Sequence, residues 1–235
     1  PNVSKYNGNF NIQHKLDSTG KELSFDLDYV SYNDKHKQQF QNRFYNAGGT
    51  LTAKPDTLQG NVPSAFEVIA GKLDLVLPFT AKTKLETGVK FSAVSSDNNV
   101  RFASIINGNP VLDVNSSNYF IYKENIYAAY ASLNTPISKK ISVQAGLRYE
   151  YTTGNGKQVT TNTRFTKEYG KLFPTLYFTY ELNEKQQFNL NYGRRVTRPA
   201  YLYINPFTDI RDRYTNQEAN PNLQPQFSQN IEFSY

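Results

Sequence analysis

Hydrophobic and polar side chains alternate with a period of two along much of this sequence. The clearest stretch runs from Lys140 to Tyr151, where every second position is apolar or aromatic and the positions between carry Ser, Gln, Gly, Arg and Glu. Successive side chains of a β-strand point to opposite faces, so this pattern predicts strands with one apolar and one polar face. It recurs at Glu22 to Tyr29, Lys84 to Ala93, Gln187 to Tyr192 and Phe227 to Tyr235.

The alternation predicts about nine strands, most of them near ten residues long, which is the length a tilted strand needs to cross a bilayer. Their expected ranges are 8–17, 22–31, 65–77, 84–95, 119–132, 140–152, 170–181, 186–193 and 226–235. Single-chain bacterial barrels have an even number of strands and no free edge in lipid. Either residues 38–53 hold a further strand or a hairpin arm, or the chain is part of a larger barrel. We favour the larger barrel.

The connections between these strands alternate between short and long. The short ones are Asp17 to Lys21, Phe79 to Thr83, Asn134 to Lys139 and Leu182 to Lys185, and the long ones are Tyr32 to Ser64, Ser96 to Asn118, Thr152 to Tyr169 and Arg194 to Pro225. Outer-membrane barrels have short periplasmic turns and long extracellular loops. Greek-key connections of a soluble sandwich would imitate only part of this contrast. We therefore expect an all-β fold, an antiparallel up-and-down transmembrane β-barrel, with residues 1–235 as one partial barrel domain.

Composition agrees with a membrane barrel. Apolar residues make up 38% and aromatic residues 14% of the chain, which argues against disorder. The mean hydropathy is −0.64, and no apolar run approaches the roughly 18 residues of a spanning helix. Many rings lie near the long connections, where an interfacial girdle is expected; ordinary cross-strand pairing is the alternative. These rings are Tyr29, Tyr32, Tyr119, Phe120, Tyr122, Tyr149, Tyr151, Phe165, Tyr169 and Phe173.

The sequence offers little that suggests catalysis or metal binding. There is no cysteine, and His14 and His36 lack metal-ligand spacing. Asp26 and Asp28 share the polar face of one strand, where a solvated lumen accommodates them without a catalytic role. The net charge of +6 comes from 26 basic residues spread along the chain, so nucleic acid is not an expected partner. We predict no enzyme activity, no metal site and no cofactor.

From Lys171 onward the chain resembles the TonB-dependent receptor and related outer-membrane β-barrel family. The resemblance rests on Phe173-Pro174, on Arg194, Arg195, Arg198 and Pro199, on Asn205-Pro206-Phe207, and on Asn220 to Pro225 leading into a strand with Glu232. Ala219, Gln224 and Gln226 depart from the usual residues. Nothing resembles a plug domain or an energy-coupling box. The resemblance implies the outer membrane, a segment from the middle and later barrel, and coupling to a TonB-type protein only through a plug outside this segment.

Residues 1–20 lack a basic start followed by an apolar stretch, so either a leader has been removed or the segment is internal. Arg194, Arg195 and Arg198 lie where a strand becomes a Pro-rich loop, with Glu232 and Asp209 as candidate partners, and they either lock the loop or contact a ligand.

We expect a transport barrel that takes up a bulky polar ligand: a siderophore or other metal chelate, an oligosaccharide or a vitamin. The alternative is a non-transporting surface protein for binding or adhesion. Loops on a rigid wall usually carry the binding groups, although these residues would also serve to pack the loops together. The candidate ligand contacts are Arg43, Tyr45, Arg194, Arg198, Tyr201, Tyr203, Arg211 and Arg213.

Overall fold

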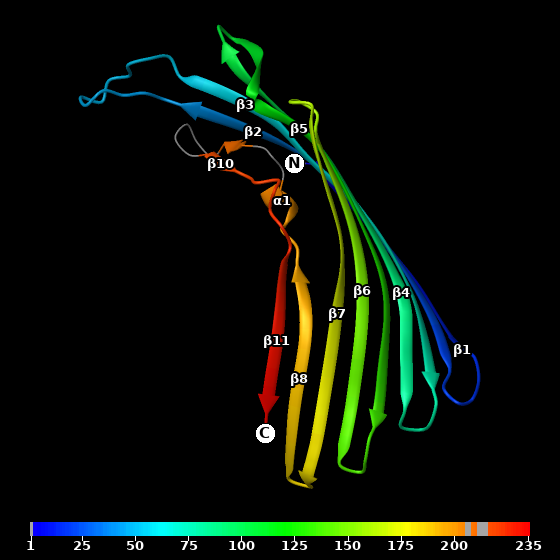
Figure 1. The fold of residues 1–235 in the computed structure, drawn as a ribbon. Coiled ribbons are helices and arrows are strands. Elements are labelled where there is room, and N and C mark those ends of the chain that lie inside the picture. Colours follow the sequence, from blue (N-terminus) through cyan, green and yellow to red (C-terminus); the bar gives the residue numbers. More distant parts are fainter. Residues whose placement is uncertain (1, 205–207, 211–215) are drawn as a thin grey trace.

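A single antiparallel sheet of nine strands dominates the computed structural model, which describes residues 2–204, 208–210 and 216–235 (Figure 1). Its strands lie side by side in the order β1-β2-β3-β4-β5-β6-β7-β8-β11. Their bounds are β1 Asn2–Lys15, β2 Glu22–Asn42, β3 Asp56–Pro78, β4 Lys84–Ile106, β5 Asn109–Pro136, β6 Ile141–Gln158, β7 Thr163–Asn183, β8 Gln186–Thr197 and β11 Gln226–Ser234. The prediction of about nine up-and-down strands is confirmed.

The register places the alternating side chains in rows across the sheet. Tyr151 on β6 lies opposite Tyr127 on β5, which lies opposite Phe91 on β4, and Glu150 lies opposite Ala128 and Lys171. Residues directly opposite each other share a face. One face, here called the outer face, therefore carries the apolar rows, and the other, the inner face, carries Glu150 and its polar neighbours.

The apolar rows span one bilayer. On β6 they run from Ile141 to Tyr151, ten residue steps. At about 3.3 Å per residue and a strand tilt near 40°, these steps cover roughly 25 Å along the membrane normal, the height of the apolar band of outer-membrane barrels. Because these apolar rows match the thickness of the lipid, the face that carries them points out of the barrel.

The strands continue far beyond this band, and here the expected long loops differ from the structure. Three of the four predicted long connections are mostly strand: β2 and β3 run out to Asn42 and back from Asp56, while only residues 107–108 lie between β4 and β5 and only residues 159–162 lie between β6 and β7. In water both faces of a strand tolerate polar residues, so the apolar alternation ends while the backbone ladder goes on. The suspected arm at residues 38–53 is the end of the β2–β3 hairpin.

Part of the predicted aromatic girdle is on the inner face. Phe120 and Phe173 are 0% and 2% exposed, and Tyr122 is also buried. Tyr127 and Tyr149 do lie exposed on the outer face. The alternation of side chains assigns a ring to one face of the sheet only when the pairing register of its strand is known. The position of a ring near a loop does not give that register.

The last connection is folded rather than open. It contains the short helix α1, Tyr201–Ile204, and a two-stranded sheet of β9, Thr208–Ile210, and β10, Asn216–Glu218. Both lie within the curve of the sheet (Figure 1). Neither was predicted, since both are only three or four residues long. Among the described residues, no helix has the length and apolar character needed to span a membrane.

Candidate ligand site on the inner wall

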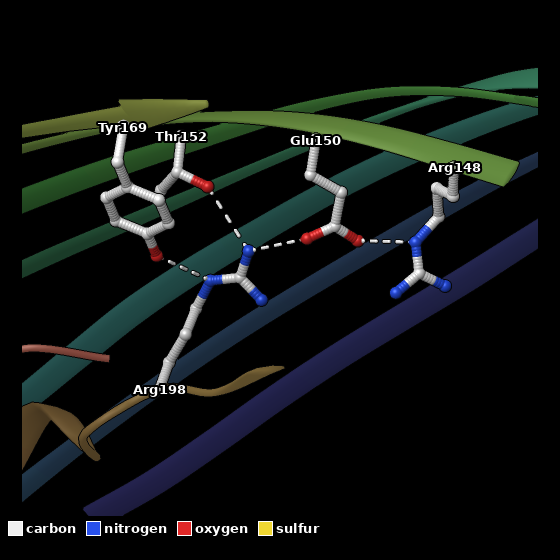
Figure 2. A network of polar contacts seen from close by, with 5 residues as sticks. All are labelled: Arg148, Glu150, Thr152, Tyr169 and Arg198. Carbon is white, nitrogen blue, oxygen red and sulfur yellow. Dashed lines mark hydrogen bonds and ion pairs between the residues drawn. The ribbon is translucent and has the colours of Figure 1, made fainter. Parts of the chain in front are cut away.

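A polar network joins the last connection to the inner face of β6 and β7. The Arg198 guanidinium donates to Glu150 Oε2 at 2.8 Å, to Tyr169 Oη at 3.1 Å and to Thr152 Oγ1 at 3.2 Å (Figure 2). The other oxygen of Glu150 contacts Arg148 Nε at 3.0 Å. One carboxylate therefore holds two guanidinium groups, one from the wall and one from the connection.

The sequence of the two strands explains why these side chains meet. Arg148, Glu150 and Thr152 occur at every second position of β6, so all three face inward. Tyr169 lies directly opposite Thr152 on β7. Arg198 follows the last residue of β8, so its side chain reaches β6 and β7 from the connection and not from a strand of the sheet. Burial lowers the pKa of Arg198, but the bonds to Glu150 and Tyr169 outweigh it and raise the pKa, so the guanidinium stays charged.

An aromatic cluster provides a second contact between wall and connection. Phe120, Tyr122 and Phe165 pack together on the inner face, and Ile204 of α1, 3% exposed, packs against them. Burial and the nearby Glu124 carboxylate raise the pKa of Tyr122, whose hydroxyl donates to Glu124 at 2.9 Å. These rings lie above the apolar band and are covered by the connection instead of facing solvent.

Two further bonds hold the connection. Lys167 Nζ donates to the Leu223 carbonyl at 2.6 Å, and burial lowers its pKa. Within the connection, the Asn220 amide donates to the Tyr203 carbonyl at 2.9 Å. The segment from Arg198 to Leu223 is thus fixed at both ends against the inner face. We call this segment the docked connection.

A groove of about 540 Å³ lies along the inner face beside the network. Its charged lining consists of five cations and one carboxylate: Lys72, Lys90, Arg148, Arg194, Arg195 and Glu150. Phe173 and Tyr130 supply rings. Lys72 pairs with Asp74 at 2.6 Å and Arg148 pairs with Glu150. Within the described part of the chain, Lys90 and Arg195 form no ion pair, so the groove keeps a positive surplus that suits an anionic or strongly polar ligand.

Arg194 is held by a ring and by a backbone carbonyl. Its guanidinium lies 5.4 Å from the centre of the Phe227 ring, and Nη1 donates to the Leu172 carbonyl at 3.4 Å. Its Nε is buried and has no hydrogen-bond partner among the described residues. A buried donor without a partner is costly, so the position of this side chain is held at a cost in stability.

The structure brings together only some of the predicted ligand residues. Arg194 lines the groove and Arg198 holds the network beside it. Arg43 and Tyr45 lie near the tip of the β2–β3 arm, where Arg43 donates to Gln41 and Tyr45 bridges Leu51. Tyr203 is half exposed on α1. The backbone of Tyr201 belongs to α1, but its side chain, like Arg211 and Arg213 as a whole, lies outside the described residues.

The expected ion partner of Arg198 was wrong. Glu232 accepts a bond from Asn230 at 2.6 Å, and Glu150 holds Arg198 instead. Glu150 is 48 residues away in sequence, so local spacing could not identify it. The other proposed partner, Asp209, has a side chain outside the described set. The sequence did contain a signal: the alternation already placed Arg148 and Glu150 on the polar face of β6.

The groove and the docked connection belong to a wall of strands that pair mostly in sequence order. A profile of the outer membrane protein β-barrel family matches residues 14–235. The chain belongs to the outer membrane protein β-barrel family. This barrel protein is thereby placed in the outer membrane, as predicted. No curated protein sequence matches it.

Two solved structures show the same fold. The ferric citrate transporter FecA in its unliganded form aligns with a TM-score of 0.54 at 14% identity, over 83% of this chain and 27% of its own. FpvA of P. aeruginosa, solved with bound pyoverdine and iron, aligns with a TM-score of 0.56 at 14% identity, over 97% of this chain and 30% of its own. The barrel protein described here therefore spans less than a third of either relative.

Proposed function

We propose that this chain forms part of the wall of a larger outer-membrane transport barrel, and that its inner-face groove contacts a bulky polar ligand during uptake. The observation that carries the proposal is the positive surplus of the groove, where Lys90 and Arg195 form no ion pair among the described residues. A siderophore or other metal chelate fits best, because it offers several anionic oxygens. A wall that only displayed an adhesive surface would need no such groove inside.

The docked connection has a place in this function. Its described parts contact the extracellular part of the inner face at Glu150, at Phe120 and at Lys167, so a ligand entering from outside meets them before the groove. Arg198 holds it through contacts to Glu150, a residue that also lines the groove. Energy coupling would come from a TonB-type protein acting through a plug domain.

The test uses the full-length protein in cells lacking other ferric-chelate receptors. Iron delivered as ferric citrate or ferric pyoverdine, the cargo named for the two structural relatives, serves as the probe. We expect Arg194→Gln with Arg195→Gln to reduce uptake at least tenfold, because each lost charge-assisted contact is worth about 1.5 to 3 kcal/mol. Lys139→Gln with Lys140→Gln, at the other end of the wall, is the matched control.

Surface expression and cell-surface binding are measured beside uptake. Normal expression with lost uptake supports the groove. Binding without any uptake, in the unmodified protein as well, would favour the surface-binding alternative. A second variant, in which Tyr201, Tyr203 and Arg211 are each replaced by Ala, asks whether the docked connection takes part: lost binding at normal expression assigns it to the site, and lost expression assigns it to packing.

A further inference from the structure

The outer face carries a hollow that the transport function does not use. It measures about 550 Å³ and is formed by apolar and aromatic side chains of neighbouring strands. Those on the outer rows are Phe25, Leu73, Val89, Phe91, Tyr127, Ala129, Tyr149 and Tyr151. Because this face meets lipid, the groups available to fill the hollow are acyl chains.

Two small residues create the hollow. Gly71 lies opposite Phe91, and Ala129 lies opposite both Val89 and Tyr149. A Cβ atom added at Gly71 would meet nothing within 4 Å. Bulky neighbours around two small positions leave a recess in the wall.

The hollow lies at the extracellular end of the apolar band. Tyr149 and Tyr151 occupy the last two apolar rows of β6, on the side away from the short turns. Tyrosine prefers this depth, where its ring meets lipid and its hydroxyl meets head groups. A lipid held here belongs to the outer leaflet.

Three cations lie above the hollow on the same face. Lys157 on β6 is directly opposite Arg164 on β7, and Lys123 on β5 is opposite Asn155, two residues from Lys157. Like charges directly opposite each other are destabilising. None of the three forms an ion pair among the described residues. The neighbouring carboxylates are engaged by hydroxyls: Glu168 by Tyr151 and Asp97 by Tyr119.

We propose that this face binds one multiply phosphorylated lipid of the outer leaflet, with an acyl chain in the hollow and its phosphates at Lys123, Lys157 and Arg164. The Lys123 row is four residues above the Tyr127 row, about 13 Å along the strand. Long basic side chains extend toward the head-group layer from such a position.

The spread of the cations selects the head group. They occupy three adjacent strands, so they extend over two strand spacings, about 10 Å. A single phosphate contacts only part of such a row, whereas two phosphates on one head group engage all three cations. A phospholipid with one phosphate is therefore the weaker occupant.

The test measures binding of bisphosphorylated lipid A to the purified full-length protein in detergent micelles. We expect Lys123→Gln, Lys157→Gln and Arg164→Gln together to weaken binding at least tenfold, and Gly71→Leu, which fills the hollow, to weaken it comparably. The matched controls are Lys82→Gln with Lys139→Gln and Lys185→Gln at the opposite end, and Gly8→Leu, an open outer-face glycine away from the hollow.

Heat-modifiable migration on gels shows that each variant is folded, and the three single charge variants replace any triple variant that fails this check. Binding that is unchanged in the charge variants or in Gly71→Leu overturns the proposal. If monophosphorylated lipid A or phosphatidylglycerol binds as tightly as bisphosphorylated lipid A, the requirement for several phosphates is overturned. Ferric-chelate uptake is expected to stay unchanged in Gly71→Leu, so this site and the inner groove fail or succeed separately.

Discussion

At the scale of single residues, the inner wall is organised around Glu150. Its side chain is only 12% exposed and holds both Arg148 and Arg198. A partly buried carboxylate with two cations is stabilised as an anion, and removing either cation leaves part of its charge without a partner. The consequence differs between the two: Arg148 belongs to the wall itself, whereas Arg198 joins the wall to the docked connection.

Replacing Arg198 by Met should release the docked connection. We expect a cost of about 2 kcal/mol, since bonds to a charged, partly buried group are lost. This converts to roughly 30-fold faster hydrogen exchange at the Asn220 amide, which donates to the Tyr203 carbonyl within the docked connection. Arg195→Met is the matched control, because Arg195 has no ion pair among the described residues. Equal exchange rates in both variants would argue against Arg198 as the anchor.

Gly156 is the second residue-scale test. It lies opposite Phe165, and a Cβ atom at this glycine would overlap the phenyl ring. Gly156→Leu should therefore displace Phe165 from its contacts with Phe120 and cost about 1 to 3 kcal/mol, as overpacking usually does. Thermal unfolding in detergent measures this loss. Asn155→Leu, on the opposite face of the same strand, should be near neutral, and a similar loss there would remove the steric explanation.

At the scale of elements, alternation decides which face meets lipid, and the height of the apolar band decides how much a charge costs. Leu147 lies near the middle of the band, and Val143 is one row from its periplasmic end. Both are on the outer face, while Gln144 between them points inward. Substitutions at these three positions therefore distinguish the effect of depth in the membrane from the effect of the face of the sheet.

We expect Leu147→Arg to destabilise the barrel by about 2 to 4 kcal/mol, Val143→Arg by less, and Gln144→Arg by little, because the cost of arginine on the lipid face falls toward the interface. Urea titration of the full-length protein refolded into lipid vesicles measures the three values. Equal costs at Leu147 and Gln144 would reverse the assignment of the faces.

The sequence predicted these elements unevenly, for physical reasons. The membrane-crossing part of each strand was found because lipid on one side and water on the other force an alternation. That contrast ends outside the bilayer, so the continuation of β4 and β5 to residues 106 and 109 left no periodic signal. The Arg198–Glu150 contact depended on a register between distant segments. The arginine itself was predicted, because its place between a strand and a Pro-rich loop is visible locally.

At the scale of the whole molecule, the sheet is open. β1 and β11 are its two edges, and each pairs on one side only within the described residues. Lipid does not tolerate unpaired backbone groups, so we expect further strands of a larger barrel to pair with these edges. The fractions of FecA and FpvA that the chain covers agree with such a segment.

Residues 1–235 alone should therefore not refold in detergent into a monomeric barrel. We expect aggregates or oligomers on gels without heat modification, while the full-length protein shows the faster migration of a folded barrel. Light scattering gives the mass of each species. A monomeric, heat-modifiable product from the isolated segment would show that its edges close on each other.

The pairing of β8 with β11 also bears on the order in which the wall assembles. Every earlier strand pairs with its successor across a short turn or a paired arm, whereas residues 198–225 separate β8 from β11. Closing 28 residues rather than about five costs roughly 1.5 kcal/mol more in chain entropy, so β11 should join last, after the docked connection shortens the search. Because the chain has no cysteine, a pair introduced at Asn189 and Ser234, which lie opposite each other, would time this step by cross-linking during refolding, against a pair at Ser142 and Thr179 that should form earlier.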